Sequence, residues 1–309
     1  MIEVNNLVKR YGDHTAVDHL SFKIEKGKIY GFLGPNGAGK STTMNMITGY
    51  IASTEGTVTI DGHDILDEPE QAKKCIGYLP EMPPLYFDMT VLEYMNFVAD
   101  LKKIPKDKKK SMVAEVMEMV KITDMKNRLI KNLSKGYRQR VGLAQAILGY
   151  PEVIILDEPT VAVDPQSRNK ILEGIQTLNR QGSTIIYTSH YMEEVEQICT
   201  RIAIMDHGRV IAQGTKEELK QMIKTGETIT VEAIALEEKN LQDIRTLDHV
   251  FDVQYEKQVL VVRCTDARHN LIRLLNYLQS QDISFGRVFS ELPTLNDVFL
   301  EITGKQLRD

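Results

Sequence analysis

The sequence lacks a hydrophobic run of about 20 residues, the length that a membrane-spanning helix needs. Basic residues are not in excess, because 38 Lys and Arg oppose 43 Asp and Glu, and a formal net charge of −5 does not indicate nucleic-acid binding. Only three cysteines occur, far apart at Cys75, Cys199 and Cys264, so they form no metal-ligand pair. The N-terminal segment has no apolar signal core. These absences predict a reduced, cytoplasmic protein.

What the chain does contain is typical of a folded protein. Hydrophobic residues make up 42% and charged residues 26% of the sequence, which excludes a disordered or collagen-like chain. Because a single core usually stops growing at roughly 250–300 residues, the 309 residues predict one large domain or two.

The first two thirds of the chain, to about Gly214, alternate short β-rich runs with longer helical segments. The runs VIIL and IIYTS are apolar throughout, which is typical of parallel strands that helices cover on both faces. We expect strands at Ser21–Glu25, Lys28–Leu33, Thr57–Asp61, Val153–Leu156, Thr184–Ser189 and Arg201–Asp206. Helices are expected at Lys40–Ile51, Pro165–Arg180 and Tyr191–Cys199.

The segment from Met89 to Gly149 has helical patterns and no convincing strand, so we interpret residues 88–149 as a helical subdomain inserted into the sheet domain. Its expected helices are Val91–Leu101, Lys108–Val120 and Arg138–Leu148. The lysine-rich run from Lys102 to Lys110 is either a solvated helix start or a contact for acidic lipid headgroups.

The C-terminal part changes rhythm after one closing helix, TKEELKQMIKTG. Its pattern of β-α-β-β-α-β-α predicts a small α+β domain that could be ferredoxin-like. The expected organisation is therefore an α/β domain over residues 1–224 and an accessory domain over residues 225–309.

A glycine-rich loop, GPNGAGKST, follows the apolar segment KIYGFL and precedes a helical segment. It matches G-x-x-x-x-G-K-[ST], in which glycines let successive backbone N–H groups surround phosphate oxygens and the following helix N-terminus attracts the same anion. We expect the lysine to reach the β- and γ-phosphates and the serine hydroxyl to ligate Mg²⁺. The predicted phosphate loop comprises Gly34, Pro35, Asn36, Gly37, Ala38, Gly39, Lys40 and Ser41.

A phosphate loop needs an acidic partner for the metal, and VIILDEPT supplies two carboxylates at a strand end. We expect Asp157 to hold Mg²⁺ through water, and Glu158 to orient or deprotonate the attacking water. Paired acids can also be a simple helix cap, but after a phosphate loop the catalytic interpretation is favoured. The chain is thus predicted to bind and cleave a nucleoside triphosphate.

Three further elements narrow the class. LSKGYRQR runs from Leu133 to Arg140, His190 closes the strand TIIYTSH, and Asp164 lies in VAVDP. With the phosphate loop and acidic pair, these motifs resemble the ATP-binding cassette family, the motor subunits of ABC transporters. The resemblance covers about residues 2–214, with every family motif in order, and implies a P-loop cassette with a mixed sheet.

The resemblance implies roles for particular residues around bound ATP. Tyr11 matches the aromatic residue that stacks on adenine, although a packing tyrosine is the alternative. Lys40, Ser41 and Thr42 match the phosphate and Mg²⁺ contacts. Glu158 matches the catalytic base, and His190 matches the γ-phosphate sensor.

The resemblance also implies a dimer. Ser134 and Gly136 match the signature loop, which contacts the γ-phosphate bound on the other cassette, and Asp164 matches the loop that couples the two sites. A chain with one phosphate loop and one signature holds two non-complementary half-sites. Two cassettes are therefore expected to meet head-to-tail, closing on ATP and opening after hydrolysis.

The sequence departs from the family pattern at several positions. Lys135 replaces the first signature glycine, Tyr137 stands where glutamine is usual, and VAVDP replaces the more usual GLDP. Glu81 occupies the place of a glutamine that reports on Mg²⁺ and on the transmembrane partner. A carboxylate can still ligate Mg²⁺, so hydrolysis remains the expected activity.

Three segments resemble the multidrug and antibiotic-resistance exporter branch of the family. They are the signature, the stretch PEMPPLYFDMTVLEYM and the terminal ELPTLNDVFLEITG. The expected partners are a second cassette and separate transmembrane permease subunits, which would hold the chain at the inner face of the membrane. The alternatives are a soluble ATP switch on ribosomes or DNA and an importer ATPase. The cargo stays open.

Overall fold

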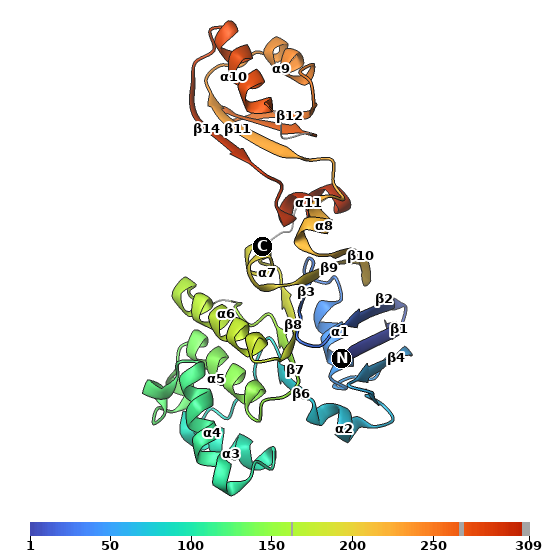
Figure 1. The fold of residues 1–309 in the computed structure, drawn as a ribbon, viewed down its shortest axis with the longest axis vertical. Helices are drawn as coiled ribbons and strands as arrows, with labels where there is room; N and C mark the ends of the chain where they lie inside the picture. Colours follow the sequence, from blue (N-terminus) through green and yellow to red (C-terminus); the bar gives the residue numbers. More distant parts are fainter. Residues whose placement is uncertain (162, 266–268, 305–309) are drawn as a thin grey trace. The chain divides into compact units, whose positions relative to one another are not determined.

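The computed structural model describes residues 1–161, 163–265 and 269–304 of the chain (Figure 1). The described residues form two compact units, the first over Met1–Thr215 and the second beginning at Lys216. The second unit starts earlier than the expected boundary at residue 225, because α8 (Lys216–Lys220) packs against α11 (Leu295–Thr303) within it. The backbone N–H of Lys224 also donates to the Glu301 carboxylate, 2.7 Å away.

The first unit is built around a six-stranded sheet with strand order β10-β9-β3-β8-β7-β6. Strands β9, β3, β8, β7 and β6 pair in parallel, and β10 pairs antiparallel with β9, which makes the sheet mixed as predicted. Every residue of β3, β7 and β8 is buried, as the uninterrupted apolar runs predicted. The strands are β3 (Ile29–Leu33), β6 (Ile76–Leu79), β7 (Val153–Asp157), β8 (Thr184–Ser189), β9 (Arg201–Asp206) and β10 (Arg209–Gly214).

A second, antiparallel sheet has the order β2-β1-β4-β5, with β1 (Ile2–Tyr11), β2 (His14–Ile24), β4 (Glu55–Ile60) and β5 (His63–Asp64). Helix α1 (Lys40–Ile47) lies between the two sheets, since one continuous core joins Val4 and Val58 to Met44 and Ile155. The helix ends at Ile47 and not at Ile51 as expected, because Gly49 adopts a φ of 65° that stops it.

The short helix α2 (Pro69–Lys74) precedes β6, and the helical block lies between β6 and β7. It contains α3 (Val91–Leu101), α4 (Lys106–Met119), two 3₁₀ turns (Thr123–Met125 and Ile130–Asn132) and α5 (Lys135–Ile147). None of its residues, all of which are described, lies in a strand, which agrees with the predicted helical subdomain. Helix α5 starts at Lys135, earlier than the expected Arg138, because Ser134 caps it by accepting the Tyr137 N–H.

Helix α6 (Pro165–Arg180) has the bounds expected from the sequence and α7 (Met192–Ile198) lies within its expected range. Both begin beyond the carboxyl ends of strands, α6 after β7 and α7 after β8. The loops that join these strands and helices therefore lie at one edge of the sheet.

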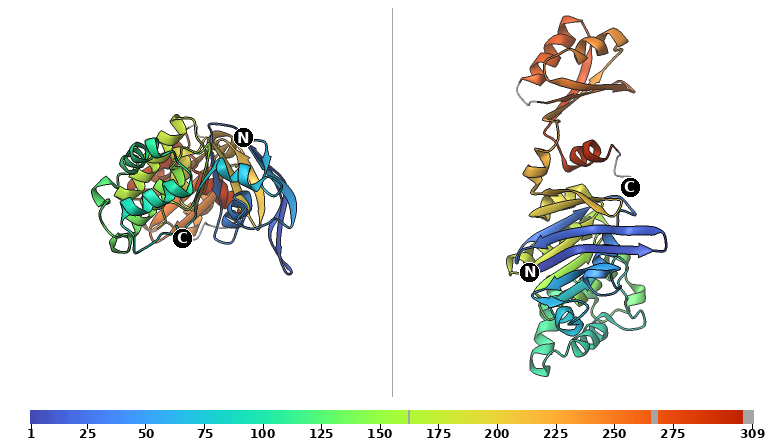
Figure 2. Two further views of the ribbon diagram at one scale, coloured as in Figure 1. Left: turned by 90° about the horizontal axis from the view of Figure 1, so that it is seen from below. Right: turned by 90° about the vertical axis from the view of Figure 1, so that its right-hand side faces the viewer.

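The second unit contains β11 (Glu227–Ala233), α9 (Glu238–Arg245), β12 (Val250–Glu256), β13 (Val259–Cys264), α10 (Asn270–Ser280) and β14 (Phe285–Glu291), followed by α11. The fully antiparallel order β12-β13-β11-β14 is that of a ferredoxin-like sheet, so this prediction is confirmed. Helices α9 and α10 cover one face of the sheet, where Leu241 and Leu274 pack on Ile229 and Val262 (Figure 2). The expected closing helix is shorter than TKEELKQMIKTG and spans only α8.

Across the described parts of both units, no helix has the length and apolar character needed to span a bilayer.

Candidate functional site

A cavity of about 420 Å³ lies at the carboxyl edge of the six-stranded sheet. Crevices at this edge are where α/β proteins bind ligands, because loops from neighbouring parallel strands converge there. The loops after β3, β6, β7 and β8 all contribute to it. The cavity is lined by Tyr11, His14, Ala16, Asn36, Gly37, Ala38, Gly39, Lys40, Ser41, Thr42, Glu81, Glu158, Val161 and His190.

The glycine-rich loop has no space for larger residues at two positions. Gly39 has a φ of 99°, and a Cβ there would lie 2.6 Å from the Ala16 carbonyl oxygen. A Cβ on Gly34 would lie 2.3 Å from the Met205 carbonyl oxygen. Glycine is required at both positions, and helix α1 then begins at Lys40 with its free N–H groups directed at the cavity. Gly34 and Pro35 form the base of the loop outside the cavity lining.

Lys40 has a 5% exposed side chain and its Nζ donates to the carbonyl oxygens of Gly34 at 2.7 Å and Pro35 at 3.3 Å. The same nitrogen is 3.7 Å from Oε1 of Glu158. Burial lowers the pKa of Lys40, and the nearby carboxylates oppose that shift, Glu158 more than Asp157. A compact positive charge in this position can bind a phosphate oxygen.

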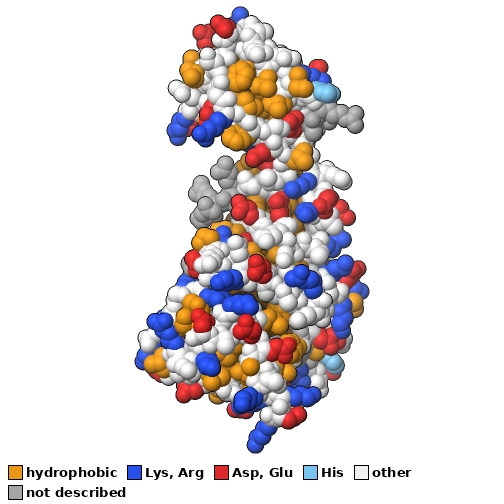
Figure 3. Space-filling model, turned by 60° about the vertical axis from the view of Figure 1, so that its left-hand side comes forward, with side chains coloured by type: hydrophobic (Ala, Val, Ile, Leu, Met, Phe, Trp, Pro, Cys, Tyr) orange, Lys and Arg blue, Asp and Glu red, His pale blue; other side chains and the backbone are white. Residues whose placement is uncertain are grey.

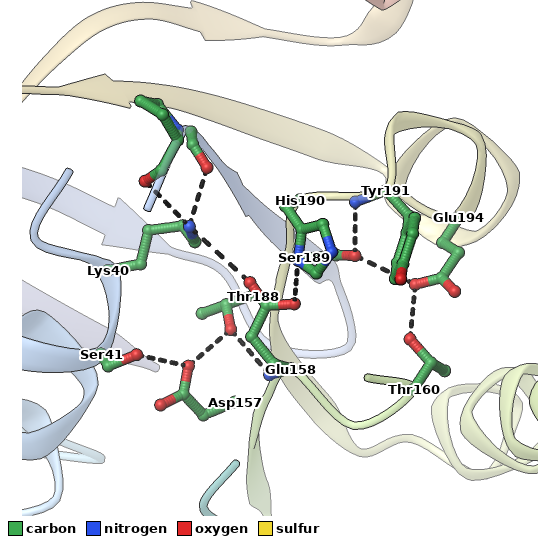
Figure 4. Close-up of polar contacts among 12 residues, drawn as sticks. Lys40, Ser41, Asp157, Glu158, Thr160, Thr188, Ser189, His190, Tyr191 and Glu194 are labelled. Atoms are coloured by element: carbon green, nitrogen blue, oxygen red, sulfur yellow. Dashed lines mark hydrogen bonds and ion pairs between the residues drawn. The ribbon is translucent and has the colours of Figure 1, made fainter. Parts of the chain in front are cut away.

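Ser41 and Asp157 supply oxygen atoms at the other side of the loop. Ser41 Oγ donates to Asp157 Oδ1 at 3.2 Å, and Thr188 Oγ1 donates to the same oxygen at 2.7 Å (Figure 4). Hydroxyl and carboxylate oxygens are the ligands that Mg²⁺ prefers. No group of three or more His, Cys, Asp or Glu side chains with metal-binding geometry occurs in the described chain. This sparse donor set fits Mg²⁺, which is commonly held by one or two protein groups together with nucleotide phosphates and water.

Glu158 and His190 are in direct contact in the cavity lining, with Nδ1 of His190 2.9 Å from Oε2 of Glu158 (Figure 4). The Glu158 side chain is 7% exposed, and its backbone has a φ of 48°, a left-handed conformation that costs energy for a residue with a Cβ. Burial raises the pKa of Glu158, and the charges of Lys40 and His190 oppose that rise. A carboxylate with a raised pKa beside a cavity is suited to accepting a proton from water.

Tyr11 and Glu81 reach the same cavity from different parts of the first unit. Tyr11 lies at the end of β1, is 52% exposed, and has the Lys9 ammonium 5.1 Å from its ring centroid. Glu81 follows β6 and is near enough to Lys40 to oppose the lowering of its pKa. Thr42 also lines the cavity.

The remaining predicted residues do not line this cavity. Ser134 is the N-cap of α5, and Asp164 is the N-cap of α6 through a 2.9 Å hydrogen bond from the Ser167 N–H. A Cβ on Gly136 would lie 3.4 Å from Ser167 Oγ, so the N-terminal turns of α5 and α6 are close. Ser134 and Asp164 therefore lie at helix N-termini that are not part of the cavity lining of their own chain.

Sequence reasoning missed several polar residues behind the cavity. Thr188 is fully buried, donates to Asp157 and accepts the Glu158 N–H at 2.9 Å. Glu194 on α7 is also buried and accepts hydrogen bonds from hydroxyl groups, including that of Thr160. For Thr188 the signal in the sequence was a polar residue near the end of an apolar strand, whereas no pattern in the sequence singled out Glu194.

Comparison with known proteins agrees with this geometry. Residues 17–161 match the family described as ABC transporter, and residues 214–303 match the C-terminal domain of ATP-binding proteins like DrrA1-3. The linearmycin resistance ATP-binding protein LnrL of Bacillus subtilis is 39% identical, and the alignment covers 100% of both chains. The chain belongs to the ABC transporter family.

Other members of the family are similar over comparable lengths. The daunorubicin/doxorubicin resistance ATP-binding protein DrrA of Streptomyces peucetius is 32% identical over 100% of this chain and 94% of its own. A dimeric ATP-binding cassette solved in a post-hydrolysis state with ADP and phosphate matches 70% of this chain and 98% of its own, with 26% identity and a TM-score of 0.64.

Membership of this family identifies the activity of the chain. This chain is an ATP-binding and ATP-hydrolysing subunit of an ABC transporter, as the phosphate loop and the acidic pair predicted. Such subunits form dimers and work with separate membrane subunits. The C-terminal unit belongs to the same branch of the family as the resistance proteins.

Proposed function

We propose that this chain powers an exporter by hydrolysing ATP at the cavity beside β3, β7 and β8. The observation that carries the proposal is that Glu158 contacts both Lys40 and His190 in the cavity lining. Its Oε1 is 3.7 Å from Lys40 Nζ, and its Oε2 is 2.9 Å from His190 Nδ1. Lys40 binds the terminal phosphates, and Glu158 accepts the proton of the attacking water. His190 holds the Glu158 carboxylate by its Nδ1 and contacts the γ-phosphate. Tyr11 stacks on the adenine at the open side of the cavity.

Hydrolysis also requires Mg²⁺ in this proposal. Ser41 and Asp157 hold the ion, with Thr42 and Glu81 nearby, and Thr188 orients Asp157 by its 2.7 Å hydrogen bond. The ion supplies charge neutralisation on the phosphate oxygens. The protein contributes a fixed carboxylate and a serine hydroxyl at the N-terminus of α1.

Two copies of the chain complete two active sites. Ser134 and Gly136 lie at the N-terminus of α5, where the free N–H groups and the helix dipole favour an anion. They are outside the cavity of their own chain, so we assign them to the γ-phosphate of the partner copy, with Asp164 linking the two sites. Lys135 is exposed and can approach the partner, whereas the Tyr137 hydroxyl donates to Asp124 of its own subdomain.

The helical subdomain offers a docking surface for the membrane subunits. A cavity of about 510 Å³ between α3 and α4 has an apolar floor that includes Leu92, Val113 and Met117. Lysines surround this floor: Lys106, Lys109, Lys110 and Lys126. This chemistry suits an amphipathic segment of a membrane subunit with acidic side chains. Such docking would hold the chain at the inner face of the membrane.

Nucleic acid is a poorer candidate than a membrane subunit for the partner of this chain. On the face that Figure 3 shows, Lys and Arg alternate with Asp and Glu and form no continuous basic surface, in agreement with the net charge of −5. The cargo class that we propose is an antibiotic-like compound, on the basis of the resistance relatives that match along the whole chain.

A charge reversal tests the docking surface. The double substitution Lys106→Glu/Lys110→Glu should prevent recovery of a multi-span protein with the tagged chain from detergent-solubilised membranes of its host. Lys108→Glu is the matched control, because Lys108 is exposed on the same helix and does not line the cavity. Recovery of ribosomes or DNA with the unaltered chain would overturn the transporter assignment of this surface.

Glu158→Gln tests the catalytic proposal. Removing the base should lower kcat by about 10²–10⁴-fold while ATP still binds. With Mg²⁺ and ATP the variant should accumulate as a dimer in light scattering, and with ADP it should stay monomeric. Turnover at the original rate, or no dimer in ATP, would contradict the assignment of Glu158 and the shared sites.

A further inference from the structure

Glu194 on α7 is a buried carboxylate that the proposed chemistry does not use. Its side chain is 3% exposed and it does not line the nucleotide cavity. One oxygen, Oε2, accepts three hydrogen bonds, from Tyr187 at 2.6 Å, Thr160 at 2.8 Å and Ser189 at 3.0 Å. Figure 4 shows Glu194 with Thr160 and Ser189. Such a carboxylate is costly to bury, so its concentration of hydrogen bonds from β8 and from the loop after β7 indicates a specific role.

Two of the donors are close neighbours of the proposed catalytic pair. Thr160 follows Glu158 by two residues, and Ser189 directly precedes His190. Ser189 Oγ also accepts the Tyr191 N–H at 2.9 Å, and the Tyr191 ring lies 4.1 Å from the His190 ring. Glu194 therefore fixes the backbone on both sides of the contact between Glu158 and His190.

The other oxygen of Glu194 faces α6. Oε1 lies 3.2 Å from Nε of Arg168, but the two atoms are not aligned for a hydrogen bond, so the contact is an ion pair without directional constraint. The Arg168 guanidinium lies 4.5 Å from the Tyr191 ring centroid. Arg168 is in the first turn of α6, where its N–H donates to the Asp164 carbonyl at 2.9 Å.

The hydroxyl donors keep their protons. Burial, reinforced by Glu194, raises the pKa of Tyr187 far above its usual value. Tyr187 is thus a permanent donor, and threonine and serine hydroxyls do not titrate. The strand side of the network is held by aligned hydrogen bonds, whereas the α6 side is held by charge alone. A shift of helix α6 would therefore reach the strand side through the Arg168–Glu194 ion pair.

We propose that Glu194 is a positioning residue that sets the Glu158–His190 geometry and couples it, through Arg168, to the α6 N-terminus that carries Asp164. The inference rests on the proposed roles of Glu158, His190 and Asp164. Its consequence is that a displacement of α6, when two copies meet, changes the alignment of the catalytic pair in the same chain.

Glu194→Gln in the full chain tests the inference. The amide oxygen can still accept hydrogen bonds from the hydroxyl groups, but the negative charge that attracts Arg168 is lost. We expect kcat to fall by about 10–100-fold, as for a misplaced catalytic group, with KM for ATP unchanged. Glu193→Gln is the matched control, because Glu193 is the exposed neighbour on α7 and should leave both constants unchanged.

A double-mutant cycle distinguishes coupling from simple loss of stability. Arg168→Gln alone should lower kcat, and in the Glu194→Gln background it should have no further effect, because the two residues act as one unit. Multiplicative effects, or a lower melting temperature with kcat unchanged, would overturn the inference. If instead Glu158→Gln hydrolyses ATP normally, the proposed function fails, and that outcome is recognised independently of Glu194.

Discussion

Thr188→Val tests how much the buried hydroxyl group of Thr188 contributes to the stability of the fold. Valine has nearly the shape of threonine and suits a buried strand. The change removes two contacts of a fully buried hydroxyl: the 2.7 Å hydrogen bond to Asp157 and the 2.9 Å hydrogen bond from the Glu158 N–H. The Glu158 N–H is then left without its partner.

The magnitude follows from these two contacts. Leaving a buried N–H unsatisfied costs about 1–3 kcal/mol, and losing a hydrogen bond to a charged group costs about 1.5–3 kcal/mol. We expect the free energy of unfolding to fall by about 3 kcal/mol, which lowers the melting temperature of a domain of this size by about 6–12 °C. Thr188→Ser keeps both hydrogen bonds and loses one buried methyl group, so it should cost only about 1 kcal/mol.

Thermal unfolding of the nucleotide-free chain, followed by circular dichroism, measures both variants. The order of melting temperatures should be the original chain, then serine, then valine. A valine variant that is at least as stable as the serine variant would refute the reasoning, because the hydroxyl would then contribute nothing beyond its volume.

Three further predictions concern the site. Because burial raises the pKa of Glu158 and the carboxylate form is the base, kcat at saturating ATP should fall as the pH drops through that raised pKa; an acid limb at the ordinary glutamate value would contradict this. Gly39→Ala brings a Cβ to 2.6 Å from the Ala16 carbonyl oxygen and should weaken ATP binding, measured by calorimetry, at least about tenfold. Gly182→Ala is the control, because Gly182 is equally left-handed but lies in open space, so this change should lower stability only. Equal ATP affinities of the two variants would refute this prediction. Ser134→Ala removes the cap of α5 and should lower stability by about 1 kcal/mol, with a far larger loss of turnover and unchanged ATP affinity of the monomer; a loss of monomer affinity would argue against a contact across the dimer.

Much of the site could be predicted because its residues follow neighbouring parallel strands. The apolar runs that end before Gly34, at Asp157 and before His190 are β3, β7 and β8, which lie side by side in the sheet. A sequence-local pattern therefore located residues that are far apart in the chain. The ferredoxin-like fold of the second unit could also be predicted, because its strands and helices follow one another with different hydrophobic periods.

The supporting network could not be predicted in this way. Thr188 and Glu194 stand beside other polar residues in the sequence, and periodicity does not say which of them is buried or which partner each one meets. The shortened α1 and the early start of α5 depend on the backbone at Gly49 and on the cap at Ser134, which are decided by local hydrogen bonds. Element bounds are set by such contacts and not by hydrophobic pattern.

The place of the helical block in the chain has a consequence for how such proteins diversify. Strands β6 and β7 pair directly, from Ile76 with Val153 to Leu79 with Leu156, so the chain leaves and re-enters the sheet in neighbouring strands. The residues between Glu81 and Ser134 can be exchanged by recombination without altering the strand that ends at Asp157 or the N-terminus of α5. Natural variation, or a designed chimaera, can thus give one ATP-driven engine a new membrane partner by replacing a single continuous stretch of coding sequence.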